Sequence, residues 1–218
     1  MTLRLGMVPW LLVMAACIPV PTPSVVTLEE PPSAELARLA AGEAIVVLPN
    51  RERESQYVAD CVREKLAEKL TQNRVLTADE VRDALFPWLE PNRTPRDDAM
   101  VQALVARPAV AQALQDLRLR YLVVVDLTST DDTVGAEVLA AGGGFSKVSA
   151  RATAEVVDLE AACCRPGGAA SATGLQGYAH VMIYGFILLS AVEGPACDRL
   201  GAALVQSLEP PAVGRAAR

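Results

Sequence analysis

A strict alternation of apolar and polar residues from Ser146 to Val156 narrows the folds open to this chain more than any other stretch. Successive side chains of a β-strand point to opposite faces of a sheet. The stretch therefore predicts a strand with one buried face and one hydrated face, which is typical of antiparallel pairing. The residues expected on the buried face are Val148, Ala150, Ala152, Ala154 and Val156.

Apolar runs and helical periodicity supply the other expected elements. Residues 44–48 and 121–127 are apolar runs that predict buried strands, with short strands at 74–76, 168–174 and 182–190. Amphipathic helices are expected after Ser55, after the capping box at Thr77, and from prolines 95, 108 and 195. The order of these elements predicts an α/β fold: a mixed, largely antiparallel sheet packed with amphipathic helices in a single domain.

The amino terminus has the pattern of an export signal. Arg4 precedes an apolar stretch that is too short to cross a bilayer, and small residues follow it. Residues 14–17, Met-Ala-Ala-Cys, resemble the lipobox of bacterial lipoproteins, with Met14 where the best-fitting boxes carry leucine. That resemblance implies removal of residues 1–16 and acylation of Cys17, including palmitate. The alternative is an ordinary signal peptide, or a signal anchor, with an incidental cysteine.

The segments after Cys17 are expected to divide into a Pro-rich tether at 17–43, a periplasmic domain at 44–209 and a flexible tail at 210–218. Position 18 is Ile rather than the Asp that resembles an inner-membrane retention signal, so we expect an anchor in the outer membrane, facing the periplasm. The formal net charge of −6 argues against nucleic acid as a partner, and against electrostatic binding to anionic lipid.

A second resemblance covers most of residues 44–209. The stretches "AIVVLP", "RVLTADEV", "LRLRYLVVVDLT" and "VVDLEA", with the helices between them, are similar in order to a periplasmic lipoprotein domain. The group comprises the curli-secretion lipoprotein, polysaccharide-export and flagellar lipoproteins, and the amino-terminal domain of the Tol–Pal propeller protein. The resemblance implies a role in envelope assembly or protein interaction, and it rests on the order of elements because no specific motif is shared.

The cysteines allow several pairings. Cys61 and Cys197 fall on apolar helix faces, and an oxidising compartment would permit a disulfide between them. The alternative is two buried free thiols. The adjacent Cys163 and Cys164 are read as a vicinal disulfide, as metal ligands or as incidental thiols, and the last reading is favoured. A metal site needs about four suitably spaced ligands, and there is no CxxC motif, so no metal is expected.

We expect no catalysis. His180 is the only histidine, and the chain has no G-x-S-x-G motif. The glycine-rich residues 142–146 lack the Lys-Ser/Thr ending of a phosphate-binding loop. An envelope hydrolase would require His180 beside a nucleophile and a carboxylate. No cofactor and no small-molecule substrate are expected either.

Residues 180–192 are apolar and allow two interpretations. The first is a buried strand, and the second is an exposed segment that meets a partner or the membrane. In the second case Tyr178, Tyr184 and Phe186 are candidate interface residues. The sequence thus predicts a membrane-anchored lipoprotein that binds other envelope proteins or assembles with itself. The alternative is a ring-forming component of a secretion or export system.

Overall fold

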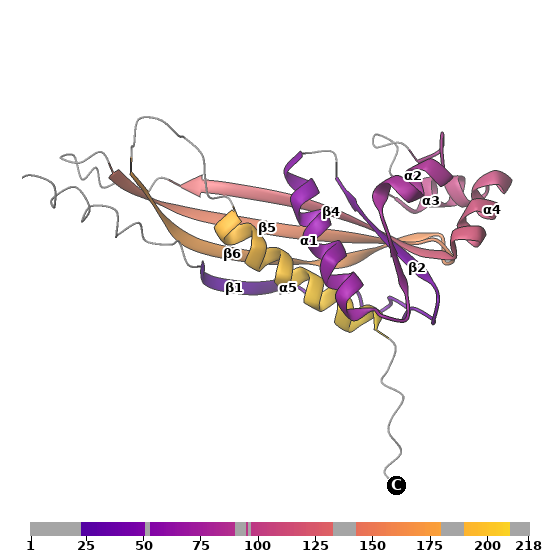
Figure 1. Cartoon of the computed structure of the whole chain (residues 1–218), viewed down its shortest axis with the longest axis horizontal. Coiled ribbons are helices and arrows are strands. Elements are labelled where there is room, and N and C mark those ends of the chain that lie inside the picture. The colour runs from indigo at the N-terminus through magenta and orange to yellow at the C-terminus, as the bar shows by residue number, and fades with distance from the viewer. Residues whose placement is uncertain are drawn as a thin grey trace, which may run out of the picture.

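A single six-stranded sheet with helices on both faces forms the body of the computed structural model, which describes residues 23–50, 53–89, 95, 97–132, 143–179 and 190–209 (Figure 1). The strand order is β1-β6-β5-β4-β2-β3. The strands are β1 (Pro23–Glu30), β2 (Ala44–Pro49), β3 (Arg74–Leu76), β4 (Leu119–Asp132), β5 (Gly143–Asp158) and β6 (Cys163–Ala179). The helices are α1 (Arg53–Lys69), α2 (Ala78–Ala84), α3 (Asp98–Val105), α4 (Pro108–Leu117) and α5 (Ser190–Leu208).

The sheet is mixed, as the sequence predicts. Strand β2 runs parallel to β3 and β4, and helices form the crossover connections that parallel pairing needs. The β4–β5, β5–β6 and β1–β6 pairs are antiparallel. The alternating stretch lies within β5, paired on both sides, so the expected α/β class and the largely antiparallel sheet are confirmed.

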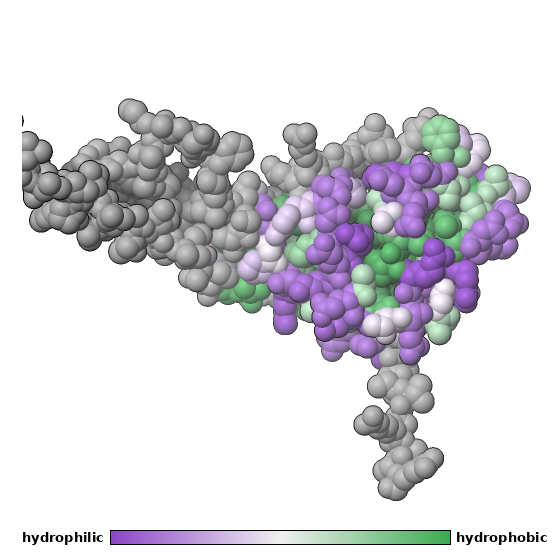
Figure 2. Space-filling model, in the orientation of Figure 1, coloured by the Kyte–Doolittle hydropathy of each residue, from purple (hydrophilic) through white to green (hydrophobic). Residues whose placement is uncertain are grey.

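Helices α1 and α5 lie side by side across one face of the sheet, and α2, α3 and α4 gather on the other face near β2 (Figure 1). Alternate residues of β4 serve the two cores. Tyr121 and Val123 pack beneath α1 and α5, whereas Leu122 packs beneath α2 to α4. The outer surfaces of α1 and α5 are mostly hydrophilic, and apolar residues show at the α2–α4 end (Figure 2).

Strands β4, β5 and β6 continue along the long axis beyond α2 to α4 (Figure 1). On the face of the sheet opposite α1 and α5, residues of these strands and of β1 carry hydroxyl groups that form hydrogen bonds between strands. Thr130 and Ser149 share a hydrogen bond, and Thr27 Oγ1 lies 2.9 Å from Ser171 Oγ. This hydrated face explains the alternation of the sequence, because the opposite face carries the buried Val148, Ala150 and Ala152.

The domain begins earlier than the sequence predicts. Residues 23–30 form the edge strand β1, and Leu36 and Leu39 are buried in the core under α1 and α5. The backbone N–H of Leu39 donates to the carbonyl of Leu208 at 3.0 Å. Residues 23–43, which the sequence assigned to a tether, therefore belong to the domain, and residues 17–22 lie outside the described residues. Proline-flanked segments misled the prediction because edge strands tolerate proline.

Three helix starts also differ from expectation. Helix α3 begins at Asp98 rather than Pro95, because Asp97 is its N-cap and accepts the backbone N–H of Met100 at 2.8 Å. Helix α5 begins at Ser190 rather than Pro195, because buried Val192 extends the apolar stripe upstream of the proline. Helix α1 begins at Arg53, so Ser55 lies inside its first turn rather than capping it. The Ser55 hydroxyl instead donates to Asp126 Oδ1 at 2.8 Å.

Candidate functional site

A disulfide joins the two helices on the first face of the sheet. Cys61 lies on α1 and Cys197 on α5, with their Cα atoms 6.3 Å apart, inside the usual range for a bridge. The structure thus brings together the two cysteines that the sequence suggested as partners. The bridge is set against the sheet, since Cys197 is fully buried.

The vicinal pair behaves differently. Cys163 is buried and Cys164 is half-buried at the start of β6, and both are free thiols. Adjacent residues of a strand point to opposite faces, which keeps the two sulfurs apart. Burial raises the pKa of Cys163, and burial together with the charge and hydrogen bond of Glu155 raises the pKa of Cys164 to about 12. Both side chains are therefore protonated, unreactive thiols at neutral pH.

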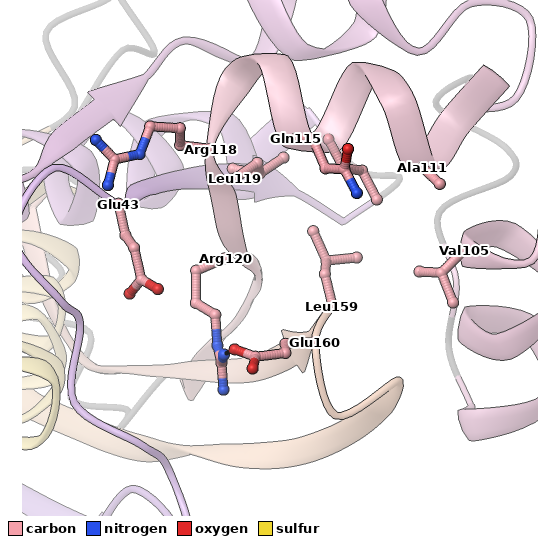
Figure 3. Close-up of a pocket in the computed structure, with 10 residues that line it drawn as sticks. Glu43, Val105, Ala111, Gln115, Arg118, Leu119, Arg120, Leu159 and Glu160 are labelled. Carbon is pink, nitrogen blue, oxygen red and sulfur yellow. Dashed lines mark ion pairs between the residues drawn. The ribbon is translucent and has the colours of Figure 1, made fainter. Parts of the chain in front are cut away.

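A cavity of about 410 Å³ opens where α4 meets the start of β4 (Figure 3). Its wall is half aliphatic and half polar. The aliphatic residues are Val105, Ala111, Leu114, Leu119 and Leu159, and the polar residues are Glu43, Gln115, Arg118, Arg120 and Glu160. Its volume falls within the range of ordinary small-molecule sites.

Arg120 is the best fixed of the charged groups. Its Nη2 atom lies 3.1 Å from Asp158 Oδ2, and its guanidinium carbon lies 5.4 Å from the centre of the Tyr121 ring. Asp158 is held in turn, because its Oδ1 accepts the backbone N–H groups of Glu160 and Ala161 at 3.0 and 2.9 Å. Burial is the largest single influence and would lower the pKa of Arg120, but the charge of Asp158 together with hydrogen bonding to Tyr121 and Asp158 outweighs it, so the pKa is raised.

Glu160 makes the second contact to this guanidinium, through Nη1, where the two side chains meet beside the cavity (Figure 3). Unlike Asp158, its side chain is 73% exposed. Arg120 Nε is buried and has no hydrogen-bond partner among the residues that the structure describes. The cavity thus presents a fixed cation whose outer partner is a solvated carboxylate.

The cavity was not foreseen from the sequence. Its residues come from the segment before β2, from α3, from α4, from the start of β4 and from the turn that follows β5. The sequence offers one local signal, since Arg118 and Arg120 flank Leu119 at the start of a strand. The structure adds that Arg118 adopts a left-handed backbone conformation with φ of 53°. Only the fold brings Glu160 to them.

Strand β1 forms one outer edge of the sheet, and an ionic clamp secures it. Arg151 of β5 reaches across β6, and its Nε lies 2.6 Å from Glu29 Oε2 while its Nη2 lies 3.0 Å from Glu30 Oε1. The hydrogen bond from Arg151 lowers the pKa of Glu29. Among the described residues no strand pairs with the outer side of β1, and the side chains of Val25 and Val26 in this edge strand are exposed.

The other predicted site residues lie beyond what can be placed. Cys17, His180, Tyr184 and Phe186 fall outside the described residues, and Tyr178 is described only as part of the β6 backbone. Over the described ranges, no cluster of three metal-ligating side chains is found, and none of the helices is long and apolar enough to span a membrane.

Comparisons with known proteins assign no family. No protein-family model matches the chain, and no curated protein matches it. Among solved structures, the hypothetical protein CT253 from Chlamydia trachomatis is similar over 77% of this chain and 95% of its own, at 12% identity and a TM-score of 0.34.

Proposed function

We propose that this chain is a non-enzymatic lipoprotein, anchored through acylated Cys17 to the outer membrane and facing the periplasm, whose domain binds other envelope proteins. One observation carries the proposal beyond the sequence pattern: only residues 18–22 separate Cys17 from the sheet. Even fully extended, that segment reaches about 20 Å. An acyl anchor at Cys17 would therefore hold the domain close against the bilayer.

The disulfide supports an extracytoplasmic location. A bridge between Cys61 and Cys197 persists in oxidising compartments and is rare where thiols are kept reduced. Anchoring raises the effective concentration of the domain toward any partner in the same membrane, so a weak contact surface suffices for binding.

The open edge of β1 favours the alternative, a ring-forming secretion or export component. A strand edge that no other described strand pairs with is a template for another strand, and β1 exposes the apolar side chains of Val25 and Val26. Self-association through this edge would extend the sheet from one copy to the next.

In-cell crosslinking of the tagged chain, followed by affinity capture and mass spectrometry, tests the proposal. A foreign envelope protein crosslinked to the wild type, and lost with Cys17→Ala, is the expected result. A ladder of self-crosslinks would instead favour the ring. Membrane retention of the Cys17→Ala chain with unchanged crosslinks would contradict the anchor.

A matched variant examines the short tether. Inserting a long Gly/Ser segment between residues 20 and 21 preserves acylation but releases the domain from the membrane surface. We expect crosslinks to partners embedded in the same membrane to weaken, while the lipid anchor stays intact. Equal crosslinking by both chains would show that proximity to the bilayer is unimportant.

A further inference from the structure

We propose that the cavity beside Arg120 binds an aliphatic carboxylate, which takes the place of Glu160 on the guanidinium. This inference goes beyond the membrane role, and it holds whether or not Cys17 is acylated. It follows from an asymmetry between the two carboxylates that contact Arg120.

The cation is fixed in place. Arg120 has a side chain only 15% exposed, and the partner on its inner side, Asp158, is 7% exposed. Asp158 is also committed to two backbone N–H groups, so it cannot follow a ligand or leave the pair. A guanidinium held in this way is preorganised, so ligand binding costs little additional conformational entropy of the Arg120 side chain.

The outer partner is exchangeable. The Glu160 end of this pair is largely solvated, and water competes there for the charge, so the contact contributes little to stability. Releasing its carboxylate to water therefore costs little. An incoming carboxylate offers Arg120 the same charge-assisted hydrogen bond, so Glu160 marks the position where a ligand head group would sit.

The rest of the cavity favours an apolar tail. Leu114, Leu119 and Leu159 line it beside the cation, and Figure 3 shows Leu159 between Arg120 and the α4 residues Ala111 and Gln115. No aromatic side chain is among the lining residues, so the wall suits an aliphatic chain. Each methylene buried there should improve affinity about fourfold.

A second arginine adds positive charge at the rim. Arg118 Nη2 is 3.4 Å from the carbonyl of Ala41, an acceptor without formal charge. The other acid of the wall, Glu43, already accepts the backbone N–H of Ala40 at 2.7 Å. Displacing Glu160 would leave two arginines beside Asp158 and Glu43, two carboxylates that already accept backbone hydrogen bonds, so an incoming carboxylate would restore the negative charge that Glu160 supplied.

The test is an NMR titration of residues 17–218, which contain every described element, made with Cys17→Ser to avoid acylation. Hexanoate is the probe, and hexanamide and hexylammonium are its neutral and cationic counterparts. With hexanoate we expect saturable amide shifts at the carboxyl end of α4 and at the start of β4. Hexanamide and hexylammonium should bind at least tenfold more weakly. Equal binding of hexanamide, preferred binding of hexylammonium, or no saturable shift at this cavity would overturn the proposal.

Variants separate the site from general charge effects. Glu160→Gln removes the competing carboxylate and should tighten hexanoate binding at least threefold. Gln115→Glu adds a negative charge at the wall and should weaken it by a similar factor. Gln112→Glu adds the same charge to exposed α4 outside the cavity and should change little. Equal effects of the two glutamine substitutions would count against the site.

A second titration, with a peptide as the probe, identifies the source of the carboxylate. Acetyl-Ala-Leu with a free carboxyl group is compared with its amide and with hexanoate. Tighter binding of the free-acid peptide would identify a protein carboxyl terminus as the ligand class. Tighter binding of hexanoate would identify a free aliphatic acid.

Discussion

Arg120 Nη2 and Asp158 Oδ2 lie 3.1 Å apart and form an ion pair that joins the start of β4 to the end of β5 almost out of contact with water. Replacing one member of a pair in this position destabilises the fold, because the other member is left buried without its counter-charge. It also sets the direction in which the guanidinium faces the cavity. The pair therefore links stability to the proposed binding site.

Asp158→Asn should lower the free energy of unfolding by about 3 kcal/mol, since Arg120 would lose its inner counter-charge while staying mostly buried. Urea unfolding at pH 7 measures the change. Asp198→Asn is the matched control, because Asp198 pairs with Lys65 at 3.0 Å on the exposed surface of α1 and α5. The control should lose less than about 1 kcal/mol. Similar losses in both variants would show that the Arg120–Asp158 pair contributes no more to stability than an exposed ion pair.

Reduction of the Cys61–Cys197 bridge should lower the melting temperature. The bridged residues are 136 positions apart, and on the chain-entropy model closing so long a loop contributes about 5 kcal/mol. The paired Cys61→Ser, Cys197→Ser chain should melt near the temperature of the reduced wild type. Thermal unfolding followed by circular dichroism, with and without reductant, provides the comparison. A melting temperature insensitive to reductant would indicate that the bridge is absent in solution.

Local rules recovered much of the fold because they depend on neighbours in the chain. At the capping box, the Thr77 N–H donates to Glu80 Oε2 at 2.7 Å and the Glu80 N–H donates to Thr77 Oγ1 at 3.3 Å, as the sequence predicts. The inward residues of β5, such as Val148 and Ala150, are buried as their alternation indicates. Period and capping reflect local geometry, which the sequence carries directly.

Strand β1 and the cavity escaped prediction for a different reason. Residues 23–30 have prolines near both ends, and their strand is defined by pairing with β6, far along the chain. The cavity joins Arg120 to Glu160 and to α4 residues through the fold alone. Long-range contacts of this kind leave no periodic signal in the sequence. The proline-rich composition therefore indicated a tether where β1 lies, and no sequence pattern indicated the cavity.

Alkylation of Cys163 and Cys164 by iodoacetamide should be very slow in the folded chain at pH 8. A pKa of about 12 leaves almost no thiolate on Cys164, and the pKa of buried Cys163 is also raised. Mass spectrometry over time gives the rate, with the urea-unfolded chain as the control. The rate should rise with pH well beyond the pKa of an ordinary thiol. Rapid modification of either cysteine at pH 8 would contradict the burial of the pair.

The same pKa shift fixes the sign of a pH effect on stability. The folded chain holds the Cys164 proton more tightly than the unfolded chain, whose thiol titrates near 8.5. The contribution of this thiol is therefore fully present below that pH and is lost as the pH rises toward 12. Cys164→Ala should reduce the alkaline loss of stability relative to wild type in urea titrations.

Arg151→Met should loosen β1 without unfolding the domain. Arg151 bonds Glu29 and Glu30 across β6, and its loss leaves β1 held by its backbone pairing, the Thr27–Ser171 hydrogen bond and the packing of Leu28. Because these side chains are exposed, we expect β1 amides to exchange with deuterium about three- to fivefold faster, with global stability changed by less than about 1 kcal/mol. Lys147→Met removes an exposed cation elsewhere on β5 and is the control.

The clamp should also respond to acid. The pKa of Glu29 is lowered by its hydrogen bond from Arg151, so the pair contributes above the pKa of an unfolded carboxyl group and is lost as the pH falls through the lower folded value. Wild-type unfolding free energy should therefore decline more steeply below about pH 4.3 than that of Arg151→Met. Parallel curves for the two chains, together with unchanged β1 exchange, would show that Arg151 does not secure the edge.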